Sequence, residues 1–181
     1  MICHLKYRLD KNLYRNYFFD NINMALPHVQ GDRVLDYWLK LYGAAEVTDK
    51  VVEDLNLTGL DILPRFSYQK KNTLLHKHID EDRMVGINLN LLDVQPIIHL
   101  YDIPYSYEAA MIDVGSIPHS IEPFEHDRLV LKLAIREPWD LVYSRLKEKD
   151  LLETFKDDYV SILKPEDVYW ATLYPKTKSY K

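Results

Sequence analysis

The sequence predicts a mostly β fold with flanking helices, and three observations support this. Residues 60–137 contain seven short runs that are rich in aliphatic and aromatic residues. Within these runs the pattern of hydrophobic residues has a period of two. Turn-forming residues separate the runs, for example Lys71-Asn72 and Gly115-Ser116. Helical periodicity is confined to the segments before and after this region. Seven short strands at this spacing indicate a β-sandwich or barrel core.

Composition places the chain among globular proteins. The 181 residues are 47% hydrophobic and suggest a single domain, 1–181. A net charge of −5 with scattered lysines and arginines predicts no nucleic-acid partner, and the apolar runs are too short to span a membrane. A single cysteine, Cys3, and an N-terminus without a signal pattern favour a cytoplasmic location.

Residues 1–59 are expected to give helical support to the core. Residues 2–9 alternate like an opening strand. Residues 32–45 are predicted to form a helix, because apolar side chains at steps of three and four give one stripe. The stripe consists of Val34, Tyr37, Trp38, Leu41 and Tyr42. A shorter helix is predicted over 48–56, and both helices should pack outside a sheet.

The core strands are expected within residues 60–137. They are predicted at 62–68, 74–80, 84–92, 97–103, 107–114, 119–124 and 129–135. Helical spacing returns in the C-terminal segment, 138–181, where Trp139, Val142 and Leu146 share one face. Pro165 is expected to begin a further short helix.

A His-x-Asp pair, formed by His78 and Asp80, is the first chemical feature. Residues two apart on a strand point the same way, so both side chains can bind one metal ion. His119 follows a turn and is placed to supply a third ligand from another strand. Two imidazoles and one carboxylate suit mononuclear iron(II), with positions left open for other ligands. His76 shares the predicted face of His78, so a cupin-type pair of these two with His119 and another metal is an alternative.

Arg128 follows nine residues after His119, on a strand whose two faces differ. Leu129, Leu131, Leu133 and Ile135 are all apolar and should face the helices. Arg128 and Lys132 then face the interior of the barrel. A guanidinium there suits a carboxylate, such as that of 2-oxoglutarate.

This order of residues resembles the 2-oxoglutarate/Fe(II)-dependent dioxygenase superfamily, and most closely its aspartyl/asparaginyl β-hydroxylase-like group. The resemblance covers residues 65–138 and is carried by Ile112-Asp113, His119-Ser120-Ile121, Arg128-Leu129-Val130-Leu131 and Pro138, together with the His-x-Asp pair. It implies a double-stranded β-helix (jelly-roll, cupin-like) core. It also implies that His78, Asp80 and His119 bind Fe(II) and that Arg128 binds the co-substrate 2-oxoglutarate, with O2 as the oxidant.

Several other residues are candidates for the pocket. Asn88 and Asn90 stand where that group often carries an Arg-x-His pair, and are expected to contact the co-substrate by hydrogen bonds. Arg83 has two interpretations, a substrate contact at the rim or a surface pair with Glu81 or Asp82. Lys132 is expected to meet an acid such as Asp113 or to help bind an anion. His76 is expected at the pocket mouth.

These features lead to an oxygenase that hydroxylates a C–H bond of an amino acid, peptide or protein side chain. The substrate is then a small molecule or a polypeptide. The alternative is a cupin-like metal-binding or ligand-binding domain without oxygenase activity, because the same scaffold serves both uses.

Overall fold

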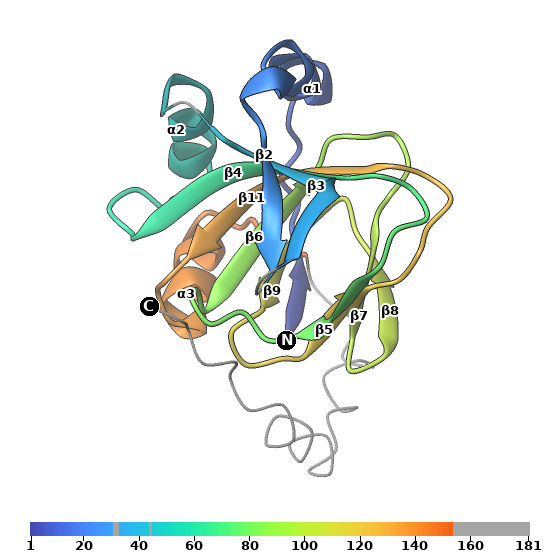
Figure 1. Cartoon of the computed structure of the whole chain (residues 1–181). Coiled ribbons are helices and arrows are strands. Elements are labelled where there is room, and N and C mark those ends of the chain that lie inside the picture. Colours follow the sequence, from blue (N-terminus) through green and yellow to red (C-terminus); the bar gives the residue numbers. More distant parts are fainter. Residues whose placement is uncertain (31–32, 44, 154–181) are drawn as a thin grey trace.

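Two antiparallel sheets form the body of the protein in a computed structural model that describes residues 1–30, 33–43 and 45–153 (Figure 1). The larger sheet has the strand order β1 (Ile2–His4), β9 (Ala109–Asp113), β6 (Val85–Asn90), β11 (Arg128–Ile135), β4 (Ile62–Gln69), β3 (Arg33–Tyr42) and β2 (Leu26–Gln30). The smaller sheet has the order β5 (Leu75–His78), β10 (His119–Ile121), β7 (Ile97–Leu100) and β8 (Ile103–Ser106). The predicted fold class, a mostly β chain with a double-stranded β-helix core, is confirmed.

Three helices cover the outer face of the larger sheet. They are α1 (Lys11–Asp20), α2 (Ala45–Asp54) and α3 (Trp139–Glu148), and a short 3₁₀ helix (Ile22–Met24) follows α1. Phe18 of α1, Leu55 beyond α2 and Leu146 of α3 join one buried cluster with Leu131 of β11. The predicted apolar face of β11 therefore does pack against helices, and burial of this face is the main source of stability.

The inner face of the larger sheet carries polar residues in register. Residues that lie directly opposite each other on paired strands share a face. Arg65, Lys132 and Asn88 are opposite one another on β4, β11 and β6. Lys40 of β3 lies opposite Ser67 of β4 in the next row. Side chains from this face and from the smaller sheet line the pocket described below.

The helix predicted over 32–45 is wrong, because this segment forms strand β3. Trp38 pairs with Gln69, and Leu41 pairs with Phe66. The apolar residues of this segment match a helical stripe, yet aromatic and β-branched residues fit a paired strand equally well. Long-range pairing with β4 decides between the two. The N-terminal part is thus not only helical support, since β1, β2 and β3 extend the sheet.

The remaining elements largely follow the prediction. All seven core strands are present, together with the helix expected over 48–56, seen as α2, and the helix that begins near residue 139, seen as α3. The opening strand is shorter than predicted, and α1, β2 and β8 were not predicted. Asp10 begins α1 by accepting hydrogen bonds from the backbone of Asn12 and Leu13. The helix expected at Pro165 lies outside the described residues.

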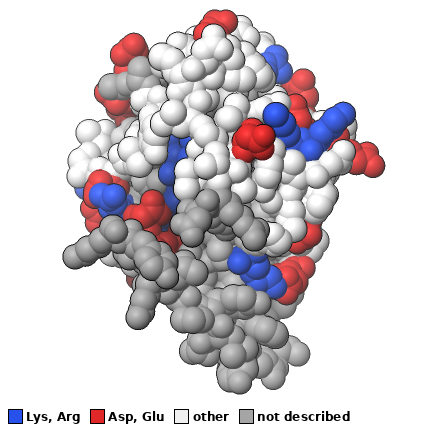
Figure 2. All heavy atoms as spheres, viewed as in Figure 1, with Lys and Arg blue, Asp and Glu red and all other residues white. Residues whose placement is uncertain are grey.

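The charges on the surface are mixed. On the face shown in Figure 2, acidic and basic side chains of the described residues occur in interspersed groups. Among the described residues, the helices are too short or too polar to cross a membrane.

Candidate metal centre

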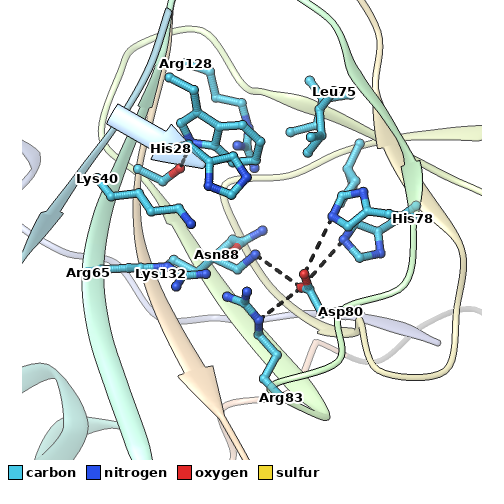
Figure 3. Close-up of a pocket in the computed structure, with 15 residues that line it drawn as sticks. His28, Lys40, Arg65, Leu75, His78, Asp80, Arg83, Asn88, Arg128 and Lys132 are labelled. Atoms are coloured by element: carbon cyan, nitrogen blue, oxygen red, sulfur yellow. Dashed lines mark hydrogen bonds and ion pairs between the residues drawn. The ribbon is translucent and has the colours of Figure 1, made fainter. Parts of the chain in front are cut away.

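Three side chains from two strands and the turn beyond them converge at one point. His78 ends β5 and lies directly opposite His119 at the start of β10. Asp80 follows two residues after His78, and its backbone N–H donates to the carbonyl of Val114 at 2.9 Å. The Nε2 atoms of His78 and His119 lie 3.6 and 3.7 Å from the Asp80 carboxylate oxygens (Figure 3). One ligand atom from each residue lies within 4.8 Å of the others, so one metal ion can contact all three.

Backbone carbonyls fix the orientation of both imidazoles. His78 Nδ1 lies 2.8 Å from the carbonyl oxygen of His76, and His119 Nδ1 lies 3.1 Å from that of Ile117. A carbonyl oxygen only accepts hydrogen bonds, so each Nδ1 carries the proton. The lone pairs are then on the Nε2 atoms that face Asp80. This second layer of contacts is typical of histidines that bind metals.

Electrostatics keep Asp80 and His119 in the protonation states that a metal requires. Burial of Asp80 opposes its charge, but Lys132 and a hydrogen bond with His78 hold the pKa of its carboxyl below the ordinary value. Burial is the main cause that lowers the pKa of His119 to about 4, and the neighbouring His78 is the second. Asp80 is therefore ionised and His119 neutral at pH 7, as metal ligands must be.

The triad opens into a pocket between the two sheets. Its described lining consists of His28, Trp38, Lys40, Arg65, Ser67, Leu75, His78, Asp80, Arg83, Asn88, Ile98, His119, Ile121, Arg128 and Lys132. The free space is about 30 Å³, which is room for roughly two waters. Long basic side chains occupy much of the remainder, so an organic ligand requires them to move.

Arg128 lies in this pocket without an acidic partner among the described residues. Its Nη2 donates to the hydroxyl of Tyr107 at 2.6 Å, and Asn88 Nδ2 donates to the same oxygen at 3.2 Å. Arg128 is only 8% exposed, and its Nε has no partner in the described part of the chain. Asn88 Oδ1 is likewise buried and unpaired. Such groups are costly unless a ligand satisfies them.

Arg83 and Lys132 both approach the carboxylate of Asp80. Arg83 Nε lies 3.1 Å and Lys132 Nζ 3.8 Å from Asp80 Oδ2. Arg83 also pairs with Asp82 at 2.9 Å, as one of its two interpretations expected, but its side chain is only 8% exposed and belongs to the pocket. Lys132 meets an acid, as predicted, although the acid is Asp80 and not Asp113.

Two predicted pocket residues lie elsewhere. The side chain of Asn90 forms hydrogen bonds with the loop after β6. Its Nδ2 donates to the carbonyl of Leu92 at 2.8 Å, and its Oδ1 accepts from the Leu92 N–H at 3.1 Å. His76 is exposed and absent from the lining. The pairing of β5 with β10 shifts register between His119 and Ile121, so strict alternation fails and Leu75 lines the pocket in place of His76.

The polar residues of the site that sequence reasoning missed include Lys40, Arg65 and Tyr107. Lys40 was assigned to a helix, which removed it from the sheet. Arg65 had a usable signal, because Arg65, Ser67 and Gln69 alternate with aromatic residues and define a polar strand face. Tyr107 lies two residues before the start of β9, and its contact with Arg128 depends on tertiary structure alone.

The fold is similar to that of known hydroxylases. A prolyl-4-hydroxylase from Pseudomonas putida aligns with a TM-score of 0.54 and 18% identity over 70% of this chain and 85% of that chain. A Trichoplax adhaerens prolyl hydroxylase, solved with a peptide of the hypoxia-inducible factor oxygen degradation domain, aligns with a TM-score of 0.51 and 10% identity over 82% and 86%. No protein-family model and no curated protein matches the sequence.

The fold and the site together define a class. The chain is a double-stranded β-helix protein whose described part carries a His-Asp-His group able to bind a metal. At these levels of identity, the structural likeness establishes the fold.

Proposed function

We propose that the protein is a 2-oxoglutarate- and Fe(II)-dependent oxygenase that hydroxylates a C–H bond of an amino acid, peptide or protein side chain. One observation carries the proposal. The Nε2 atoms of His78 and His119 and the carboxylate of Asp80 converge in the same pocket that holds Arg128. Two imidazoles and one carboxylate are the ligands of non-haem iron(II) oxygenases.

The three ligands have distinct tasks in this proposal. His78 and His119 each present Nε2 to the metal position, and the backbone carbonyls of His76 and Ile117 hold their rings in place. Asp80 provides the negative charge that favours a divalent ion. When bound, iron and 2-oxoglutarate supply the oxidising chemistry, and the protein supplies position and shelter.

Arg128 is the residue that would hold the distal carboxylate of 2-oxoglutarate. Its unpaired Nε and its fork geometry suit a carboxylate. Tyr107 receives hydrogen bonds from both Arg128 and Asn88, so its own O–H remains to donate. Asn88 thus acts here through Tyr107, while Asn90 stabilises the loop after β6.

The apolar part of the lining would limit access of water. Leu75, Ile98 and Ile121 are all buried and belong to the smaller sheet beside the triad. Exclusion of water strengthens electrostatic contacts and prevents side reactions. The residues quoted for the aspartyl/asparaginyl β-hydroxylase-like group support that subgroup. A polypeptide substrate is consistent with the Trichoplax adhaerens prolyl hydroxylase of similar fold, which was solved with a peptide.

The proposal is tested by reconstitution. Protein loaded anaerobically with Fe(II) should bind 2-oxoglutarate and, after admission of O2, convert it to succinate. Asp80→Ala should abolish both metal retention and turnover. A loaded protein that neither binds nor converts 2-oxoglutarate would refute the oxygenase and favour a ligand-binding domain.

A further inference from the structure

The pocket carries far more positive charge than the proposed reaction uses. Among the described residues, its lining contains five cations, Lys40, Arg65, Arg83, Arg128 and Lys132, and one acid, Asp80. The whole chain, in contrast, has a net charge of −5. The two charges of a divalent ion offset those of 2-oxoglutarate, so an excess of four positive charges remains with both bound. A buried excess of this size calls for a further anion.

Three of the five cations already have tasks. Arg128 is proposed to hold the co-substrate, and Arg83 and Lys132 approach Asp80. Lys40 and Arg65 are left, from the adjacent strands β3 and β4. In the described part of the chain, neither forms an ion pair with a carboxylate. Figure 3 shows both side chains extending into the pocket on the side opposite His78.

The surroundings of these two residues suit the binding of an anion. Arg65 is only 4% exposed, and its Nε has no partner among the described residues. The Lys40 ammonium lies 6.0 Å from the ring centre of Trp38, which limits its position. Burial and the nearby Arg65 lower the pKa of Lys40 to about 8, so it remains mostly charged at pH 7. The half-buried Lys40 and the buried Arg65 carry like charges, which repel each other unless an anion lies between them.

We propose that Lys40 and Arg65 bind a carboxylate of the substrate, and that the substrate is therefore an acidic amino acid or an acidic side chain of a peptide. This inference rests on the proposed oxygenase function. A planar guanidinium beside an ammonium suits a carboxylate, and the limited free space favours a small anionic group.

Such a contact would determine which C–H bond is presented to the metal. Lys40 and Arg65 belong to the larger sheet, whereas His78 and His119 belong to the smaller sheet. A substrate anchored on the first wall extends its carbon chain toward the second. Lys40 and Arg65 are thus specificity-determining residues, and they do not touch the reacting atoms.

Binding measurements can test this without turnover. Protein loaded with Mn(II) and 2-oxoglutarate under anaerobic conditions is titrated with acid and amide pairs by calorimetry. The probes are L-aspartate against L-asparagine and L-glutamate against L-glutamine, each as the free amino acid and within a capped tripeptide. We expect at least one acid to bind about tenfold more tightly than its amide. Lys40→Gln and Arg65→Gln should each remove most of this preference, and Arg65→Lys should keep part of it.

A matched control and separate readouts keep the outcomes distinct. Lys50→Gln, on the exposed surface of α2, should retain the full preference. Failure of the loaded wild type to bind 2-oxoglutarate would refute the proposed function itself. If 2-oxoglutarate binds but neither acid binds more tightly than its amide, the inference is overturned and the oxygenase proposal stands. Tighter binding of inorganic phosphate than of either acid would also overturn the carboxylate assignment.

Discussion

His78 and His119 are far apart in the sequence but lie directly opposite each other in the antiparallel pair of β5 and β10. Their ring centres are 4.3 Å apart, and the rings are inclined by 49°. Strand pairing therefore sets the positions of both imidazoles, and the short segment after β5 has only to bring Asp80 beside them. This arrangement defines which substitutions should abolish metal binding.

Loss of Asp80 should remove the metal, whereas loss of His76 should not. Asp80 supplies the only carboxylate of the triad, while His76 contributes its backbone carbonyl, which a substitution keeps. We expect Asp80→Ala to retain almost no Fe(II) after gel filtration and His76→Ala to retain an amount close to that of the wild type. Elemental analysis of anaerobically loaded samples measures both. Equal losses in the two variants would favour the cupin-type ligand set of His76, His78 and His119.

Arg128 should control the affinity for 2-oxoglutarate. Its guanidinium is buried, and its only described side-chain partner is the hydroxyl of Tyr107. We expect Arg128→Gln to raise the Kd of the Mn(II)-loaded protein for 2-oxoglutarate by about tenfold or more, because a charged hydrogen bond is lost. Tyr107→Phe should have a smaller effect in the same direction. Calorimetry measures the change.

The control for this prediction is again Lys50→Gln, whose side chain is 74% exposed on α2. An Arg128→Lys variant separates charge from geometry, since lysine keeps the charge but loses the fork. An unchanged Kd in Arg128→Gln would show that another cation of the pocket holds the co-substrate.

The metal-free protein should lose stability between pH 6.5 and pH 4. Burial lowers the pKa of His119 from 6.5 to about 4, so folding disfavours the charged imidazole. The contribution of neutral His119 is fully present above pH 6.5 and is lost as the pH falls toward 4. The loss attributable to His119 is about 3 kcal/mol by linkage. His28, whose pKa is also lowered to about 4 by burial, adds to the same window.

Urea unfolding at several pH values, with and without His119, measures this effect. His119→Gln should reduce the difference in unfolding free energy between pH 7 and pH 4, whatever its effect at pH 7. His76→Gln, at an exposed position, is the matched control. A pH dependence that is identical in wild type and His119→Gln would contradict the predicted environment of His119.

The strands and the positions of the triad could be predicted because both are local patterns. A period of two identified the core strands, and residue order along the chain placed His78, Asp80 and His119 near strand ends. The two faces of β11 were also readable, because Leu129, Leu131 and the other odd positions are uniformly apolar.

Other features depend on contacts between distant segments and could not be predicted in this way. Strand β3 carries an apolar spacing that fits a helix, and only its pairing with β4 makes it a strand. The register shift between β5 and β10 exchanges His76 for Leu75 in the pocket. The excess of cations in the pocket depends on the order of β11, β4 and β3 in the sheet, which brings Lys132, Arg65 and Lys40 to one face.

Replacement of Arg65 by an apolar residue should stabilise the ligand-free protein. Arg65 is almost fully buried, has an unpaired Nε and shares the pocket with four further cations. Removal of an uncompensated buried charge relieves repulsion and desolvation, and methionine has a similar length and can adapt to the space. We expect Arg65→Met to raise the free energy of unfolding by about 1 kcal/mol, the usual size of a gain made at the expense of function. Arg136→Met, at an exposed residue, should change it by less than about 0.5 kcal/mol. Chemical denaturation of both variants without ligand is the measurement. A clear destabilisation by Arg65→Met would mean that Arg65 stabilises the fold and is not reserved for binding an anion.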